Sequence, residues 1–205
     1  MPELRSNSQF QFTAGNLSLD FTNTLDNRGA ENEIDLLANY ADLLAWGVAA
    51  RTLSRSDAER LLGLAEKNPV QARAALRRAL QLRESMYTIF SAIAERRIVP
   101  GSSLSLLNAE VQQAGEHARI VSVNRSFSWE WIAPEANLAS PLWPIARDAA
   151  ELLTEGPLEL VRTCAAETCG WLFLDTTKNH RRRWCDMKTC GNRNKARRYY
   201  QRAQR

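Results

Sequence analysis

The residues best suited to chemistry in this 205-residue sequence are its four cysteines, which all lie near the C-terminal end. They form two Cys-x4-Cys pairs, Cys164 with Cys169 and Cys185 with Cys190, separated by 15 residues. Thiolate pairs two to four residues apart can hold one tetrahedral zinc ion, and a loop of about 15–20 residues between pairs is typical of such sites. A glycine follows each pair and lets the backbone turn close to the sulfur atoms. We therefore predict one structural Zn2+ per chain, held by these four thiolates.

Other uses of the cysteines stay open. The thiols could form two disulfides or stay as unconnected buried groups, but residues 1–12 are polar and lack the apolar stretch of a secretory signal. We therefore expect a cytoplasmic protein, and in the cytoplasm thiols stay reduced and more often bind metal. His180 lies between the pairs and could replace a cysteine, although four thiolates already complete the set. A catalytic zinc keeps an open position and usually has a histidine ligand, so a closed structural site is the stronger prediction.

Positive charge is concentrated in the same region. Residues 162–205 contain 12 of the 27 basic residues and three of the 23 acidic ones, a balance of +9, which leaves the rest of the chain at −5. One basic cluster lies between the cysteine pairs, and a second lies after residue 191 in a stretch without acid, proline or glycine that can form a helix. Such side chains can contact phosphates, and Arg or Asn can read base edges. The candidate nucleic-acid-binding residues are Lys178, Arg181, Arg182, Arg183, Asn192, Arg193, Asn194, Lys195, Arg197 and Arg198.

DNA is the partner that this pattern favours, and three alternatives stay open. A run of basic residues can be no more than a solvated surface, although a zinc anchor beside it favours binding. RNA could bind the same surface if Tyr199, Tyr200 and the nearby tryptophans stack on bases. The zinc could instead staple a protein-interaction module whose basic helix meets an acidic partner. No general base, nucleophile and oxyanion donors converge in the sequence, so we do not expect an enzyme.

The elements that must position this module are mainly helical. Apolar residues recur at spacings of three and four, which predicts helices over 34–48, 56–67, 70–97, 103–114 and 142–153. Alternating apolar residues over 120–131 predict a β-hairpin around Asn124-Arg125-Ser126. The longest uncharged apolar run, 43–50, has eight residues and is too short to span a membrane. We predict a mainly α fold with a small β-hairpin: a helical N-terminal domain, 1–160, and a small four-cysteine zinc module, 161–205, that ends in a basic helix.

Two stretches resemble known families. The sequence from Phe173 to Arg193, with its Cys-Gly-Asn-Arg at 190–193 and Arg-Trp-Cys-x-Met around Cys185, resembles the CGNR zinc-finger family of bacterial proteins. Upstream, Leu-Asp-Phe-Thr-Asn-Thr-Leu-Asp-Asn-Arg at 19–28 is similar to the ABATE domain that usually precedes this finger. The resemblance implies a stress-responsive bacterial transcriptional regulator in which the four cysteines bind zinc.

The N-terminal motif suggests a role for the first domain. Asn23, Asp26 and Arg28 could line a pocket for a small-molecule effector. The alternative is a buried Arg–Asp pair beside an Asn that caps a helix. We expect the N-terminal domain to sense a signal or to pair subunits, because a homodimer would double a weak DNA contact surface.

Overall fold

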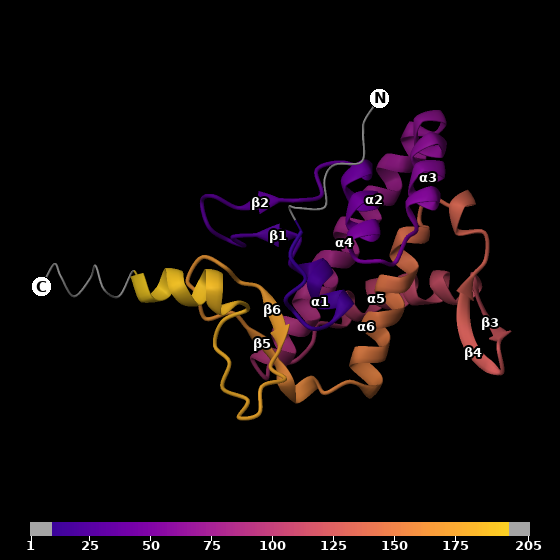
Figure 1. Cartoon of the computed structure of the whole chain (residues 1–205). Coiled ribbons are helices and arrows are strands. Elements are labelled where there is room, and N and C mark those ends of the chain that lie inside the picture. The colour runs from indigo at the N-terminus through magenta and orange to yellow at the C-terminus, as the bar shows by residue number, and fades with distance from the viewer. Residues whose placement is uncertain (1–9, 197–205) are drawn as a thin grey trace, which may run out of the picture.

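The computed structural model describes residues 10–196 and has a mainly helical fold with small antiparallel strand pairs, as predicted (Figure 1). The helices are α1 (Leu17–Thr22), α2 (Tyr40–Ala49), α3 (Arg55–Lys67), α4 (Pro69–Ala94), α5 (Gly101–Glu116) and α6 (Trp143–Glu155). The strands pair as β1 (Leu25–Asp26) with β2 (Ile34–Asp35), β3 (Ala118–Val123) with β4 (Ser126–Trp131), and β5 (Val161–Thr163) with β6 (Leu172–Leu174). Short 3₁₀ turns lie at η2 (Pro134–Ala136), η3 (Ser140–Leu142) and η4 (Leu158–Leu160), and a π-helical turn, η5 (Met187–Gly191), leads into helical residues 192–196. In this part of the chain no helix is both long and apolar enough to cross a bilayer.

Several helix starts differ from the prediction by one or more residues, and capping residues explain those of α2 and α3. Helix α2 begins at Tyr40 rather than at 34, because Asn39 and Asp42 form a capping box in which each side chain accepts the other's backbone N–H at 3.1 Å. Residues 34–35 instead pair with β1 as a strand. Helix α3 begins one residue earlier than predicted, since Ser54 accepts the N–H of Asp57 at 3.0 Å.

The longest helix, α4, is the central element of the core. It contacts α1, α2, α3 and α5 as well as the strands β5 and β6. Leu82, Met86 and Phe90 lie four residues apart on one face of α4 and are almost completely buried. Burying each of these side chains contributes about 1.5–3 kcal/mol. Helix α4 therefore supports both the helical body and the strands that lead into the cysteine segment.

The apolar core continues past residue 160. Val161, Leu172 and Phe173 are fully buried, and they belong to the same cluster of contacting side chains as the helices. Strands β5 and β6 lie beside α1 and α4, whereas the helical residues after η5 extend away from the body (Figure 1). The cysteine segment is thus built onto the helical body, and its division from 1–160 as a separate functional domain stays a prediction.

The predicted hairpin is confirmed as β3 and β4. Asn124 and Arg125 form its two-residue turn, with φ of +50° and +66°. Positive φ at both central residues is the geometry of a type I′ turn, whose twist matches that of the flanking strands. The hairpin lies at the opposite end of the molecule from β5, β6 and η5 (Figure 1).

Candidate metal centre and basic surface

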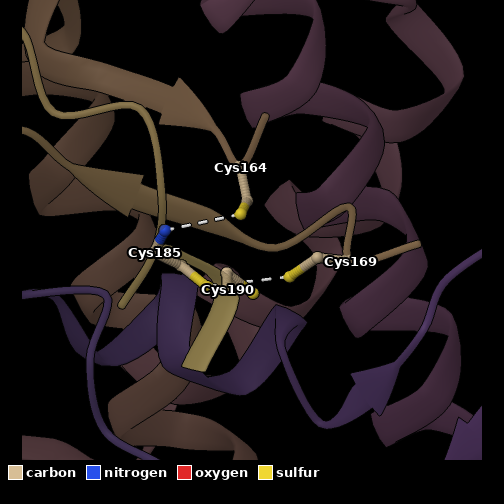
Figure 2. Close-up of side chains that lie close together, drawn as sticks. All are labelled: Cys164, Cys169, Cys185 and Cys190. Carbon is tan, nitrogen blue, oxygen red and sulfur yellow. Dashed lines mark hydrogen bonds between the residues drawn. The ribbon is translucent and has the colours of Figure 1, made fainter. Parts of the chain in front are cut away.

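Four short segments bring the cysteines together. Cys164 directly follows β5, and its N–H donates to the Trp171 carbonyl at 2.7 Å, which extends the β5–β6 ladder. Cys169 lies in the turn between these strands, where its N–H donates to Ala166 at 3.1 Å. Cys185 ends the long loop after β6, and Cys190 lies within η5. All four side chains point toward one another (Figure 2).

The distances between the sulfur atoms fit a tetrahedral zinc site. The four buried Sγ atoms lie within 4.8 Å of one another, and all four thiols are free. Cys185 Sγ is 3.6 Å from Cys169 Sγ and 3.7 Å from Cys190 Sγ. Zinc–sulfur bonds of about 2.3 Å in a tetrahedron place the sulfurs about 3.8 Å apart. The cluster therefore has the size that four thiolates around one zinc ion require.

The protonation of the thiols also favours a cation at this position. Hydrogen bonds from Cys169 and Cys185 lower the pKa of Cys164, and the backbone N–H of Cys185 also donates to Cys164 Sγ at 3.4 Å. Donating to Cys164 raises the pKa of Cys169 and of Cys185, while burial raises the pKa of Cys190. Neighbouring negative charges repel in a buried site, so each further thiolate needs a compensating positive charge. A divalent cation compensates the charge of further thiolates and allows them to form.

Comparison with known families agrees with this geometry. The family model of ABATE, described as "Putative stress-induced transcription regulator", matches residues 15–156. The chain belongs to the ABATE family. The model of the CGNR zinc finger matches residues 161–203, and this finger with its four clustered cysteines accounts for one structural zinc ion per chain. Both family descriptions name a regulator or a zinc finger rather than an enzyme. No curated protein matches the chain.

A buried carboxylate shapes the basic loop of the CGNR finger. Asp175 is fully buried and is the only acidic residue between the two cysteine pairs. Its carboxylate accepts the backbone N–H of Thr177 at 3.1 Å and that of Arg182 at 2.8 Å. Burial alone would raise the pKa of Asp175, but a hydrogen bond from the Thr177 hydroxyl, at 2.5 Å, and these two backbone hydrogen bonds lower it. Asp175 was not among the predicted site residues, although its position as the lone acid in a basic loop was a usable signal.

Arg182 points into the finger rather than toward solvent. Its Nε donates to the Trp184 carbonyl at 2.9 Å, and its Nη2 donates to the carbonyls of Thr13, at 3.2 Å, and Cys185. Its guanidinium carbon lies 4.5 Å from the centroid of the Phe173 ring. The described contacts of Arg182 therefore hold the loop against the cysteine cluster.

The neighbouring basic residues are exposed. Lys178, Arg181 and Arg183 all have exposed side chains. Arg181 and Arg183 line a groove of about 510 Å³ beside the cysteine cluster, with Arg182 in its wall and Asp186 also at its edge. His180 is exposed as well; its Nδ1 lies 2.9 Å from the Asp175 carbonyl, and it is not part of the cysteine cluster.

The second group of basic residues begins where η5 ends. Arg193 and Lys195 are exposed on the helical turn 192–196, and Asn194 is half-buried. Asn192 is exposed, and its Nδ2 donates to the Lys188 carbonyl at 3.1 Å. The predicted residues Arg197, Arg198, Tyr199 and Tyr200 lie outside the described residues.

The three residues predicted as an effector pocket have separate surroundings. Asn23 is buried, and its side chain pairs with the backbone of Leu172. Arg28 forms an ion pair with Glu84 at 2.5 Å, and its guanidinium lies 3.8 Å from the centroid of the Tyr87 ring. Asp26 lies beside the metal centre, where it and Arg193 line a cavity of about 50 Å³. The partner of Arg28 is thus Glu84 rather than Asp26, and an effector pocket at these residues stays a prediction.

Proposed function

We propose that this chain is a DNA-binding transcription regulator whose zinc-loaded CGNR finger contacts the phosphate backbone. The observation that carries the proposal is the position of the exposed basic side chains around the cysteine cluster. Arg181 and Arg183 project from the loop between the two cysteine pairs, and Arg193 follows the last cysteine. One bound ion would thus hold both basic segments in a fixed relation to each other.

In this proposal Cys164, Cys169, Cys185 and Cys190 are the zinc ligands. Structural zinc in small modules supplies about 10–16 kcal/mol of apparent binding free energy, and this energy is available to fold the segments that carry the ligands. The loop from 175 to 184 contains little buried apolar surface. Its conformation therefore depends on zinc, on Asp175 and on Arg182.

The proposed contacts divide into two kinds. The exposed cations Lys178, Arg181, Arg183, Arg193 and Lys195 contact phosphates, together with Arg197 and Arg198 beyond the described residues. The amides of Asn192 and Asn194 lie at the start of the helical turn, where they could reach base edges. We assign Arg182 to the support of the loop rather than to a phosphate contact.

The ABATE part, 1–160, is proposed to sense an effector or to pair two subunits. A second subunit would place two fingers on one duplex, and tethered contacts of this kind bind far more tightly than single ones.

The test compares two double variants that remove the same charge. Arg181→Ala/Arg183→Ala removes two cations beside the cysteine cluster, whereas Arg73→Ala/Arg77→Ala removes two exposed cations from α4. We expect only the first variant to weaken binding to duplex DNA. Its log–log salt slope should become shallower by about 1.8, since each phosphate contact contributes about 0.9.

Three outcomes would redirect the proposal. Equal weakening by both double variants would indicate a general charge effect rather than a finger contact. RNA that displaces duplex DNA at equal concentration would favour the RNA-binding alternative. A protein partner that is retained after nuclease treatment, together with no DNA affinity at low salt, would favour the interaction module.

A further inference from the structure

A second site of interest lies at the opposite end of the molecule from the zinc finger. The hairpin β3–β4 and the helices α5 and α6 line a partly open cavity of about 280 Å³. Apart from a few polar groups at its edge, its walls are apolar, with Val111 and Ala114 from α5, Ala150 from α6, and Trp129 and Trp131 from the hairpin. A concave apolar site with a small number of polar groups is the usual form of a small-molecule site. We call this cavity the hairpin cleft.

One face of the hairpin forms the aromatic wall of the cleft. Residues paired across an antiparallel ladder lie on the same face, and the pairs here are Ala118 with Trp131, Ile120 with Trp129, and Ser122 with Phe127. Trp131 is held in place by Trp143, at a centroid distance of 5.8 Å. Trp129 is 53% exposed although it lines the cavity. The cleft therefore has one fixed aromatic ring and one that is open to solvent.

Polar groups at the edge of the cleft define the ligand chemistry. The guanidinium carbon of Arg147 lies 4.3 Å from the centroid of the Trp129 ring. Arg147 Nε and Nη2 both contact Glu151 Oε1, at 2.7 and 2.6 Å. Among the described residues, Nη1 has no hydrogen-bond partner. Because Glu151 already balances the charge of Arg147, the free Nη1 donor suits a neutral acceptor better than a full anion.

We propose that the hairpin cleft binds a small, flat, uncharged aromatic molecule that carries a carbonyl-type acceptor. The ring of the ligand stacks against Trp129 and Trp131, and its acceptor receives a hydrogen bond from Arg147 Nη1. A cavity of about 280 Å³ accommodates about two fused rings and little more. The binding requires no nucleic acid, so this proposal is independent of the function proposed for the finger.

The test uses prodan, a neutral naphthalene that carries a carbonyl group and whose fluorescence shifts when it leaves water. Full-length zinc-loaded protein is titrated with prodan and, separately, with N-phenyl-1-naphthylamine, which is of similar size and lacks a carbonyl. We expect one prodan site per chain with blue-shifted emission. Trp129→Ala should weaken prodan binding about tenfold through lost stacking. Arg147→Met should weaken it about fivefold, the effect of one net hydrogen bond, and change N-phenyl-1-naphthylamine binding less than twofold.

Phe127→Ser is the matched control. Phe127 lies on the same hairpin face and is 77% exposed, but it does not line the cleft. This variant should keep the affinity for prodan, and unchanged circular dichroism and zinc content would show that all variants are folded. The proposal is overturned if prodan does not bind at one site. It is also overturned if Phe127→Ser weakens binding as much as Trp129→Ala, or if Arg147→Met affects both probes equally.

Discussion

The side chain of Asn23, at the end of α1, forms two hydrogen bonds with the backbone of Leu172 in β6. Its Nδ2 donates to the Leu172 carbonyl and its Oδ1 accepts the Leu172 N–H, both at 2.9 Å. The two residues are 149 positions apart, and one lies in the ABATE match and the other in the CGNR match. Among the described residues β6 pairs with β5 alone, and the Asn23 side chain satisfies the backbone of Leu172 on the opposite edge of β6. It fixes the start of the zinc finger to the helical body.

We predict that Asn23→Ala destabilises the whole chain rather than the helical body alone. The change leaves a buried N–H and a buried C=O of Leu172 without partners, at a cost of about 1–3 kcal/mol for each group. Urea denaturation of zinc-loaded protein should therefore show a loss of about 2–6 kcal/mol in the free energy of unfolding. Asn32→Ala, at an exposed position in the β1–β2 loop, is the control and should change stability by less than about 0.5 kcal/mol. A loss below about 1 kcal/mol for Asn23→Ala would mean that the pair does not hold the two parts together.

Arg181 and Arg182 are adjacent in the chain, but their mutations should affect different properties of the protein. Arg182→Ala removes hydrogen bonds to the carbonyls of Trp184 and Thr13, so it should lower stability by about 2–3 kcal/mol and speed the transfer of zinc to a chelator. Arg182→Lys should not restore these properties, because an ammonium group cannot match the forked guanidinium. Arg181→Ala should leave the rate of zinc transfer unchanged and weaken DNA binding. Measurements of stability and of zinc-transfer rate on all three variants test these expectations. Equal zinc-transfer rates for Arg181→Ala and Arg182→Ala would contradict them.

A buried acid in the ABATE part should give stability a distinctive dependence on pH. Burial raises the pKa of Asp20 to about 6, although the Ala14 N–H donates to its carboxylate at 2.9 Å. Because the folded-state pKa lies above the unfolded value, the contribution of Asp20 to stability is complete below about pH 4. This contribution is lost as the pH rises through 6, by about 3 kcal/mol in total. Asp20→Asn should therefore become more stable than the parent protein as the pH rises from about 4 to about 7.

Unfolding free energies of variant and parent are compared at each pH, so that any zinc release in acid is shared by both proteins. Asp57→Asn provides a control of opposite sign. Hydrogen bonds from Ser54 and Arg60 lower the pKa of Asp57, so its replacement should cost stability at neutral pH and not below its folded-state pKa. A difference between Asp20→Asn and the parent protein that does not change with pH would show that Asp20 is not the responsible group.

Features that depend on local spacing could be predicted from the sequence. The two Cys-x4-Cys pairs predicted the cluster, since short ligand spacing allows each pair to bind from one turn. Asn124 tolerates positive φ and lies between alternating apolar runs, so the β3–β4 hairpin was also predictable. The start of α2 was not, because the apolar spacing continues through 34–37 while the capping box at Asn39 and the pairing of β2 with β1 set the actual boundary.

Features that depend on distant contacts could not be predicted. Charge alone groups Arg182 with Arg181 and Arg183, and only the folded chain places the Thr13 carbonyl and the Phe173 ring beside its guanidinium. The same holds for Asn23, whose partner lies in β6 at the other end of the sequence. The hairpin cleft requires α5, α6 and the hairpin to meet, so alternating residues predicted the strands but not the cavity beneath them.

We propose that zinc at the four cysteines organises a DNA-binding surface. Measuring zinc per chain and duplex DNA affinity across a salt series on one sample, with and without a strong chelator, tests this proposal. We expect about one zinc per chain and an affinity that falls as salt rises, with a log–log slope of about 0.9 for each phosphate contact. Binding should be lost on chelation and restored by added zinc. Freshly reduced protein without zinc, or zinc-loaded protein that fails to bind DNA at low salt, would contradict the claim.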